Sequence, residues 1–322
     1  MGQIGPFLFG AVAFCLGVAT FPWLISRLAA WHVGQRVHAY SPATHAAKQG
    51  IPTMGGIGFV WVPILGFIFL AHSASGFAVF FCMVAGLVIG LLDDISNVRG
   101  KGQLGLLARQ KLVLQLVAGL VAGAFLLRVG ISQQYVPGAG LVEFGGWTVL
   151  IGTAALVGAT NGVNLTDGLD GLAGSTGAVA LAVLCWIAVA EGNLQVALIG
   201  LGVLGGLLAF LLFNWSPARL FMGDSGALAL GGVIAGMALV LGVVWLLPLL
   251  GIVFVIEVLS VAINVTAVVR FHRHLLRSSP LHHHFEELKY SETTIVRGFI
   301  GLGLAGAIAT VLLVWPVVYS IR

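Results

Sequence analysis

Hydrophobic and polar positions alternate along this chain in long blocks rather than residue by residue. Apolar runs of roughly 17 to 25 residues, long enough to cross a bilayer as helices, are separated by short polar stretches. A membrane β-barrel would show period-2 alternation in segments of about 10 residues, and the sequence has no such alternation. The pattern therefore predicts an all-α, polytopic membrane protein.

Ten apolar runs predict ten transmembrane helices. They cover residues 4–25, 54–71, 77–92, 111–129, 147–163, 171–190, 195–213, 226–241, 243–269 and 297–320. Only a turn at Gly242 separates the eighth run from the ninth, and Pro248 lies in the first third of the ninth, so this boundary is the least regular. No repeat or low-complexity linker divides the chain, and we interpret residues 1–322 as one integral membrane domain.

The basic residues predict the orientation of these helices. If the helices alternate across the membrane, one set of connections comprises residues 26–53, 93–110, 164–170, 214–225 and 270–296. Together with Lys111 and Arg297 at adjoining helix ends, this set carries thirteen of the fifteen Lys and Arg. By the positive-inside rule it is cytoplasmic, and both chain termini lie on the extracytoplasmic side. The net charge of +4 is thus a topology signal and not a sign of nucleic-acid binding.

Composition agrees with a membrane protein and adds a hint of chemistry. The chain is 59% hydrophobic and only 8% charged, with a mean hydropathy of +1.07. Cys15, Cys82 and Cys185 each fall in an apolar run, which favours small core residues over disulfides or metal ligands. Eight of the eleven acidic residues and eight of the nine histidines share the predicted cytoplasmic side. Acidic residues contribute little to topology, so this gathering indicates chemistry at that face.

Paired aspartates end the third run, in "GLLDDISNVRGKG" (90–102), with Arg99 and Lys101 a few residues on. The simplest interpretation is a helix end entering water. Negative charge at a helix C-terminus is electrostatically unfavourable, so Asp93 and Asp94 would need a positive partner, such as a metal ion. The unfavourable placement favours a function for the pair.

A second polar segment, "NGVNLTDGLDGLAG" (161–174), repeats amide and carboxyl side chains every third residue: Asn161, Asn164, Asp167 and Asp170. On a continuous helix these four would spread over half the circumference. The glycines between them allow the backbone to break and wrap around a polar ligand. A break before a helix also presents free N–H groups to an anion.

Two further segments carry candidate ligands. In "NWSPARLFMGDSGALALGG" (214–232), Asp224 and Ser225 precede the eighth run, where a helix N-cap is a strong alternative to a functional role. Phe221 in the same polar loop can stack on a nucleobase. The segment "THAAKQGIPTMGG" (44–56) contributes Lys48 and Thr53, and by itself indicates little more than an interfacial anchor.

Three consecutive histidines lie in "SSPLHHHFEE" (278–287). Successive helical residues point about 100° apart, so we predict an extended or irregular loop in which His282 and His284 share one side and His283 takes the other. A zinc site would need further ligands, for which His272 and His274 are candidates. The abundant carboxylates favour a hard, oxygen-liking cation instead, and leave the histidines to bind or protonate phosphate.

Taken in order, these segments resemble the polyprenyl-phosphate N-acetylhexosamine-1-phosphate transferases. The match runs from Lys48 to about Arg297 and consists of "GIPTMGG", "LLDD", "NLTDGLDGLA", "FMGDSGALALGG", "EVLSV" and "PLHHHFEE". The triple histidine resembles the phospho-N-acetylmuramoyl-pentapeptide branch more than relatives that use other UDP-amino sugars. The chain departs from the family pattern at Ile51, where Thr is usual, at Asn264, where Gln is usual, and in "FEELKYSE", and these differences concern sugar and peptide contacts.

The resemblance implies a ten-helix, homodimeric, Mg²⁺-dependent enzyme of the bacterial plasma membrane with a cytoplasmic active site. It would transfer phospho-MurNAc-pentapeptide from UDP-MurNAc-pentapeptide to undecaprenyl phosphate, giving lipid I and UMP in peptidoglycan biosynthesis. One alternative is a related transferase that uses another UDP-N-acetylhexosamine. An alternative from another class is an ion-coupled transporter, which also has intramembrane carboxylates and broken helices; here only Glu257 lies deep in a run.

The resemblance also assigns roles to residues of this chain. The implied catalytic group comprises Asp93, Asp94, Asp224, His282, His283 and His284. The implied substrate-binding group comprises Lys48, Thr53, Asn161, Asn164, Asp167, Gly168, Asp170, Asn214 and Phe221, with Phe221 near the uracil. Asp224, aided by Asn161, is the implied magnesium ligand.

Two mechanisms are open for such a transfer. The lipid phosphate is largely dianionic at neutral pH, because its second pKa is about 6, so we favour its direct in-line attack, with Asp93 accepting any residual proton. The alternative is a covalent phospho-aspartate formed on one of the paired aspartates.

Overall fold

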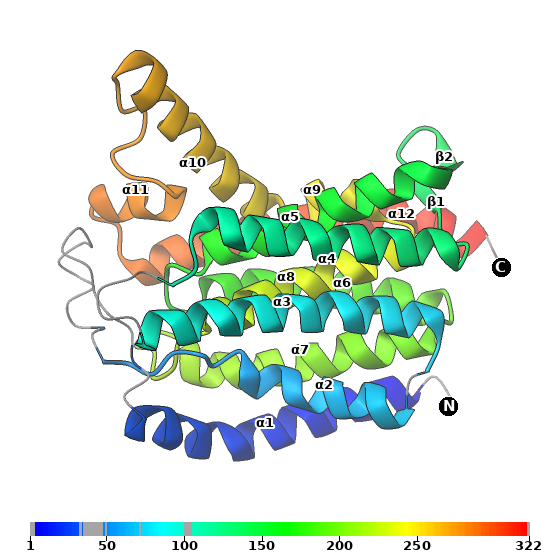
Figure 1. The fold of residues 1–322 in the computed structure, drawn as a ribbon, viewed down its shortest axis with the longest axis horizontal. Coiled ribbons are helices and arrows are strands. Elements are labelled where there is room, and N and C mark those ends of the chain that lie inside the picture. Colours follow the sequence, from blue (N-terminus) through cyan, green and yellow to red (C-terminus); the bar gives the residue numbers. More distant parts are fainter. Residues whose placement is uncertain are drawn as a thin grey trace.

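The computed structural model describes residues 4–31, 34, 48, 50–70, 72–99 and 105–320, and most of these lie in helices arranged side by side in one bundle (Figure 1). The long helices are α1 (Ile4–Ala30), α3 (Ala74–Arg99), α4 (Ala108–Arg128), α5 (Thr148–Thr166), α6 (Leu172–Ala190), α7 (Leu194–Asn214), α8 (Gly223–Val240), α10 (Ile252–Phe271) and α12 (Glu292–Ser320). The short elements are α2 (Ile57–Leu70), α9 (Leu247–Leu250), α11 (Leu281–Glu287), the 3₁₀ turns η2 (Gly145–Trp147) and η3 (Val244–Leu246), and the strands β1 (Gln133–Val136) and β2 (Gly140–Glu143). The predicted helical class is confirmed, with one antiparallel hairpin added.

Nine of the described helices are long and apolar enough to cross a membrane. This agrees with a multi-pass protein, but it does not confirm the predicted total of ten spans. The shortfall lies in the predicted span 54–71, where α2 has only 14 residues. Such a helix is roughly 21 Å long, whereas the hydrocarbon core of a bilayer is about 30 Å thick.

The predicted ninth span, 243–269, is not one helix, and that prediction was wrong. After the expected turn at Gly242, whose φ is +67°, the chain forms η3 and α9, and α10 begins only at Ile252. Pro248 is compatible with α9 because it lies in the first turn, where its missing N–H has no helical partner to lose. Gly251 separates α9 from α10, and α10 then rises obliquely out of the bundle (Figure 1).

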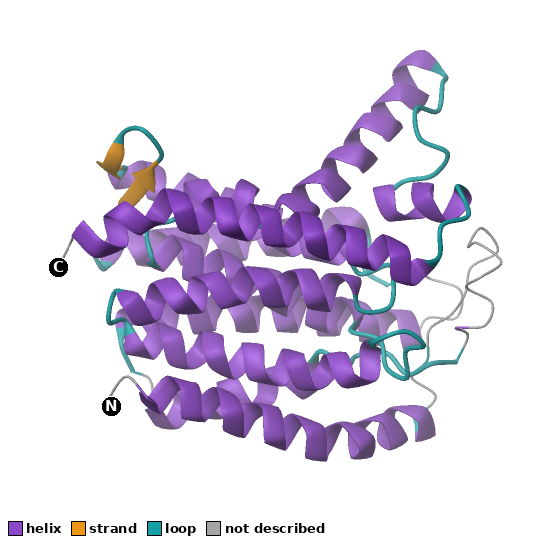
Figure 2. Ribbon diagram, turned by 180° about the vertical axis from the view of Figure 1, so that it is seen from behind, coloured by secondary structure: helices purple, strands orange, loops and turns teal. Residues whose placement is uncertain are grey.

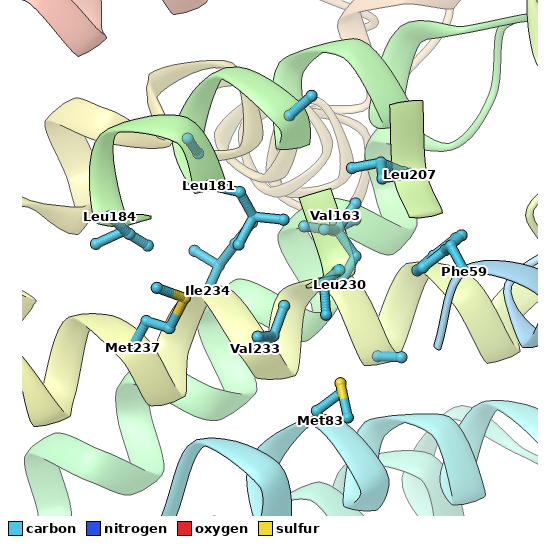
Figure 3. Close-up of a cluster of buried hydrophobic side chains, with 14 of the residues drawn as sticks. Phe59, Met83, Val163, Leu181, Leu184, Leu207, Leu230, Val233, Ile234 and Met237 are labelled. Atoms are coloured by element: carbon cyan, nitrogen blue, oxygen red, sulfur yellow. The ribbon is translucent and has the colours of Figure 1, made fainter. Parts of the chain in front are cut away.

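Helix α8 forms the centre of the bundle. In its most apolar stretch 83% of the residues are buried, far more than in a helix with one lipid-facing side. Its side chains pack with those of α2, α3, α5, α6 and α7 (Figure 3), including Phe59, Met83, Val163, Leu181, Leu184, Leu207, Leu230, Val233, Ile234 and Met237. A helix surrounded by protein can carry polar groups at its end without exposing them to lipid.

The cysteines only partly follow their prediction. Cys82 and Cys185 are buried in the core, as expected, but Cys15 is exposed on α1. An apolar run does not reveal which side of a helix faces lipid, because lipid-facing and protein-facing residues are both hydrophobic. All three are free thiols.

Close packing of α3 on α8 depends on glycines of α3. A Cβ on Gly86 would lie 2.2 Å from the Leu228 carbonyl oxygen, and a Cβ on Gly90 would lie 2.2 Å from the Asp224 carbonyl oxygen. Small residues let two helix backbones approach in this way. Asp93 and Asp94 follow one turn later on α3, so the same packing brings them to the beginning of α8.

The bundle has two unlike ends. The start of α1, the end of α12 and the β1–β2 hairpin lie at one end, whereas α11 and the connection that follows α10 lie at the other (Figures 1 and 2). The terminal residues 1–3 and 321–322 are outside the described part of the chain. Which end faces the cytoplasm therefore stays a prediction of the charge pattern.

Gly86→Ala tests the contact between α3 and α8. We expect a loss of about 1–3 kcal/mol, the usual effect of overpacking, because the new methyl group meets backbone that cannot move aside. Gly158→Ala in α5 is the matched control, since a Cβ there has nothing within 4 Å and Ala favours helix. Thermal unfolding in detergent measures both. Equal melting temperatures for the two variants would contradict the close approach.

Candidate active site

The N-terminus of α8 is capped by a side chain from another helix. Asp94 of α3 accepts hydrogen bonds from the backbone N–H groups of Asp224 (3.1 Å) and Ser225 (2.9 Å), one with each carboxylate oxygen. These N–H groups have no partner within the helix, and the positive end of the helix dipole attracts the carboxylate. The N-cap role that was the alternative for Asp224 and Ser225 does not apply, because both lie inside the first turn. Asp94 takes that role.

Asp93 and Asp224 share a lysine that the sequence patterns did not single out. Lys111 Nζ lies 3.2 Å from Asp93 Oδ2 and 2.5 Å from Asp224 Oδ2. Asp93 Oδ1 also accepts from the Leu106 N–H (2.7 Å), and Asp224 Oδ1 accepts from Asn164 Nδ2 (2.9 Å). Residues from α3, α4, α5 and α8 therefore meet around one positive charge.

We predicted that Asp93 and Asp94 lie at a helix end, and this prediction was wrong. Helix α3 continues to Arg99, so the dipole of α3 is less unfavourable to them than expected, and the capped end of α8 is favourable. The side chain of Arg99 and the whole of Lys101 lie outside the described residues.

Two glycine-containing motifs far apart in sequence are joined through their backbones. The Phe221 N–H donates to the Pro52 carbonyl (2.8 Å), and the Gly55 N–H donates to the Phe221 carbonyl (2.8 Å). A Cβ on Gly56 would lie 2.0 Å from Gly226 Cα, so only glycine permits this contact. These contacts hold the half-buried Thr53 beside Gly223. A Cβ on Gly223 would lie 2.9 Å from the Thr53 hydroxyl oxygen.

The predicted break in the third motif is present. Helix α5 ends at Thr166, residues 167–171 form turns, and α6 starts after Gly171, whose φ is +79°. Asn161 and Asn164 thus lie on the last turns of α5, and Asp167 and Asp170 in the break. Burial, reinforced by the charges of Asp224, Asp94 and Asp170, raises the pKa of Asp167 to about 8.

The side-chain NH₂ of Asn161 bonds to α4 and to its own helix. Its Nδ2 donates to Gln115 Oε1 (2.9 Å) and to the Val157 carbonyl (2.8 Å). Of the two asparagines, Asn164 is therefore the one with a described contact to Asp224.

Lys48 lies at a second charged cluster beside this break. Its ammonium contacts Asp170 Oδ1 (2.7 Å) and Glu292 Oε1 (2.6 Å), and it lies 6.0 Å from the centre of the Phe221 ring. Burial alone would lower the pKa of Lys48, but the two carboxylates outweigh it and the pKa is raised. Glu292 Oε1 also accepts from the Asp170 N–H (2.6 Å), which ties the first residue of α12 to the break.

Asn214 and Phe221 complete this side of the site. Asn214 is buried, with Oδ1 accepting from the Gly171 N–H (3.0 Å) and Nδ2 donating to the Leu220 carbonyl (2.9 Å). Its amide is therefore engaged in holding the break against the 215–222 loop. Phe221 is half-buried rather than exposed.

The three histidines lie in a helix, and our prediction of an extended loop was wrong. Pro280 is the N-cap of α11, which contains all three, and successive helical positions point about 100° apart. Their surroundings therefore differ. His282 Nδ1 lies 3.2 Å from Glu257 Oε1, His283 Nδ1 lies 2.6 Å from Glu286 Oε2, and His284 Nδ1 accepts from the Arg277 N–H (3.1 Å).

His282 and the break are in direct contact. A Cβ on Gly168 would lie 2.1 Å from His282 Nε2, so the imidazole packs against the bare Cα of the glycine. The rings of His282 and His283 have their centres 4.2 Å apart. Burial lowers the pKa of His282, and Glu257 offsets this only in part. The histidine helix thus packs directly on the aspartate-containing break.

The donor atoms of this site suit magnesium better than zinc. Among the described residues, no group of three or more His, Cys, Asp and Glu side chains is arranged to hold a metal, and His272 and His274 are exposed. Magnesium prefers oxygen donors and is usually held by one or two carboxylates together with substrate phosphates. Asp93 and Asp224 already converge on one cation, the Lys111 ammonium.

Sequence patterns missed three residues of the site: Lys111, Glu257 and Glu292. Lys111 was interpreted only as a topology signal, and Glu292 as one of several cytoplasmic acids. Glu257 did carry a signal, since it is the one acidic residue deep in an apolar run.

Asn264, where the family usually has Gln, uses Oδ1 to accept from the Leu275 and Leu276 N–H groups (3.2 and 3.1 Å). It therefore shapes the connection from α10 to α11.

Residues 76–242 match the family described as glycosyl transferase family 4. A phospho-N-acetylmuramoyl-pentapeptide-transferase of Halalkalibacterium halodurans is 38% identical over 94% of this chain and 96% of the relative. Proteins of the same name are 40% identical in Oceanobacillus iheyensis, over 91% and 93%, and 38% identical in Bacillus thuringiensis, over 96% and 97%.

Asp94→Asn tests the cap of α8. The amide keeps one acceptor oxygen but turns an NH₂ group toward the second N–H and removes the charge, so we expect a loss of about 1–2 kcal/mol in unfolding free energy. Glu143→Gln on the exposed strand β2 is the control for loss of a carboxylate. Chemical or thermal unfolding in detergent measures the difference, and a shift no larger than the control's would contradict the cap.

Asp167→Asn tests the raised pKa. Between its ordinary value of 3.8 and about 8, the unfolded chain releases the Asp167 proton while the folded protein retains it, so the parent loses stability as pH rises. Asn does not titrate. We therefore expect the melting temperature of the variant, minus that of the parent, to increase from pH 5 to pH 8 with a metal chelator present. A constant difference would show that Asp167 is not protonated in the folded protein.

Proposed function

The chain belongs to glycosyl transferase family 4 and, within it, to the phospho-N-acetylmuramoyl-pentapeptide transferases, and from this premise we propose that it transfers phospho-MurNAc-pentapeptide from UDP-MurNAc-pentapeptide to undecaprenyl phosphate. The products are lipid I and UMP, and the reaction belongs to peptidoglycan biosynthesis. The enzyme is a multi-pass protein of the bacterial plasma membrane, with its active site on the cytoplasmic face. It is a homodimer.

The observation that carries this proposal is the convergence of five separated segments at one end of an apolar bundle. Contacts link residues 48–56, 93–94, 161–171, 214–225 and 281–284 into one polar region. A lipid phosphate can be presented only near the membrane surface, and a nucleotide arrives only from water. Reactive groups gathered at one end of the spans meet both conditions.

We propose Mg²⁺ as the cofactor, with Asp224 as its main protein ligand. Asn161 stays a candidate ligand through its amide oxygen, since its Nδ2 is bonded to Gln115 and Val157; Asn164 lies nearer to Asp224. When bound, the ion would neutralise charge on the diphosphate and stabilise the departing phosphate. Lys111, between Asp93 and Asp224, adds positive charge from the protein itself.

The residues around the break would bind the nucleotide. Phe221 offers part of its ring for stacking on the uracil, as aromatic side chains do with bases. Lys48 keeps its charge because of Asp170 and Glu292, and it lies over the same ring. His283 is half-buried, and its ring lies beside that of His282, which packs on the break. The equally half-buried His284 is bonded to the Arg277 N–H, so His283 is our candidate to reach the diphosphate or the sugar.

In the reaction we propose, an oxygen of the lipid phosphate attacks the phosphorus that bears the sugar. The bond from that phosphorus to the oxygen of the UMP phosphate breaks, and UMP leaves. Phosphoryl transfer of this kind depends mainly on positioning and on neutralising charge. Asp93 would accept any residual proton, and Asp94 would act by holding the N-terminus of α8, and with it Asp224.

Direct attack is favoured over a phospho-aspartate by the contacts of the paired aspartates. Both oxygens of Asp94 accept N–H groups of α8, and the oxygens of Asp93 accept from Leu106 and Lys111. A carboxylate oxygen that is already hydrogen-bonded is a weaker nucleophile, and attack by Asp94 would break the contacts that hold α8.

An ion-coupled transporter is disfavoured as well, because the deep acid Glu257 is engaged by Leu281 and His282.

The assay is UMP release by the purified protein in detergent or nanodiscs. It should require undecaprenyl phosphate, UDP-MurNAc-pentapeptide and Mg²⁺, and Asp224→Asn should lower kcat by about 10²–10³, the effect of removing one group that stabilises charge in the transition state. Glu143→Gln is the matched control at the other end of the bundle. UMP release with equal efficiency from another UDP-N-acetylhexosamine would favour the related transferase. Turnover that persists in chelator would contradict the cofactor.

A further inference from the structure

Glu257 is a carboxylate buried within a membrane-spanning helix. It lies in α10, and none of its side chain is exposed to solvent. Burial of an ionisable group at such a position is unfavourable unless the group has partners, and it generally marks a function. No step of the proposed reaction involves Glu257.

Both oxygens of Glu257 are directed to the start of the histidine helix α11. Oε2 accepts from the Leu281 N–H at 2.6 Å, and Leu281 is the first residue of α11. Pro280, the N-cap, has no side-chain oxygen that could bond to the first turn, so Glu257 serves as a cap from another helix. Oε1 lies 3.2 Å from His282 Nδ1.

His282 passes this contact on to the active site. Its side chain is fully buried, and its Nε2 packs on Gly168 in the aspartate-containing break. Among the described residues, neither ring nitrogen of His282 nor Glu257 Oε1 has an aligned hydrogen bond. The 3.2 Å between Nδ1 and Oε1 is nevertheless within hydrogen-bond distance, and neutral His282 has one ring proton to give.

We propose that Glu257 is a positioning residue for the transferase: through Leu281 and His282 it fixes α11 against the break that holds Asp167 and Asp170. It does not touch the substrate. The side chain that it places is His283, the next residue of α11, whose ring lies beside that of His282. This inference rests on the proposed function for its kinetic consequences but not for its structural ones.

Two substitutions separate the cap from the contact with His282. Glu257→Gln keeps an oxygen that can accept from the Leu281 N–H, but it replaces the carboxylate oxygen facing His282 by an NH₂ group. Glu257→Ala removes both. Glu287→Gln is the matched control, because it makes the same chemical change on an exposed side chain at the end of α11.

The first measurement is hydrogen exchange of the peptide that covers residues 281–287, which requires no catalysis. We expect Glu257→Ala to speed its exchange by at least about 10-fold, because the helix loses its cap, whereas Glu257→Gln and Glu287→Gln stay near the parent. Unchanged exchange in Glu257→Ala would overturn the proposal. This result stands even if the parent releases no UMP, in which case the proposed function alone has failed.

The second measurement is steady-state kinetics of Glu257→Gln, His282→Gln and the double variant. We expect Glu257→Gln to lower kcat by about 10- to 100-fold, the effect of a small misplacement of a reacting group, with KM for the nucleotide substrate within about 2-fold. The double variant should be no slower than His282→Gln, because Glu257 acts through His282.

Two kinetic results would overturn the proposal: a parental kcat in Glu257→Gln, or a double variant whose loss is the product of the two single losses. Loss of both nucleotide binding and protection of residues 281–287 in Glu257→Gln would overturn it as well. Should Glu257→Gln not fold, Glu257→Asp is the second variant. It keeps the charge but is one methylene too short to reach Leu281 and His282. A parental kcat in Glu257→Asp would equally refute positioning.

Discussion

The capped N-terminus of α8 is the interaction on which the rest of the site depends. Asp94 can accept the N–H groups of Asp224 and Ser225 only because glycines of α3 bring the two backbones together. Helix α8 is surrounded by protein along its length, so the cluster of carboxylates at its N-terminus is shielded from lipid. Asp224 is then presented by a rigid, buried helix, and Lys111 and Asn164 are placed against it. The apolar bundle thus holds its polar site through backbone contacts.

Charge is divided between two neighbouring clusters with different chemistry. Around Lys111 there are three carboxylates for one ammonium group, because Asp94 lies beside Asp93 and Asp224, and this excess of negative charge favours a further cation. Around Lys48, two carboxylates hold one ammonium beside an aromatic ring, which suits a nucleotide. The break at residues 167–171 lies between them, and the pKa of Asp167, raised to about 8 by burial and its acidic neighbours, reflects how closely these charges are packed.

The histidine helix illustrates why residue identity does not settle a role. Its three imidazoles are chemically identical, yet they contact a buried acid, a neighbouring glutamate and a loop backbone respectively. His284 shapes the preceding loop, and His282 connects α10 to the break. Their positions on a helix, rather than along a strand, separate these environments, because each successive side chain turns by about 100°. One motif therefore supplies three different contacts.

The sequence by itself determined the membrane class and the residue types of the site, because hydrophobic length and unusual polar motifs are local properties. It also determined most of the spans; the exceptions are the short α2 and the segment before α10, where η3 and α9 replace the start of the predicted ninth span. The break after Thr166 also followed from its glycines. Only the tertiary structure decided that Asp94 caps α8, that Lys111 joins Asp93 to Asp224, and that Glu257 reaches α11. These contacts connect residues from 18 to 131 positions apart, and no local pattern specifies which helix faces which. Packing of glycine-rich surfaces decides that, because it selects the backbones that can approach.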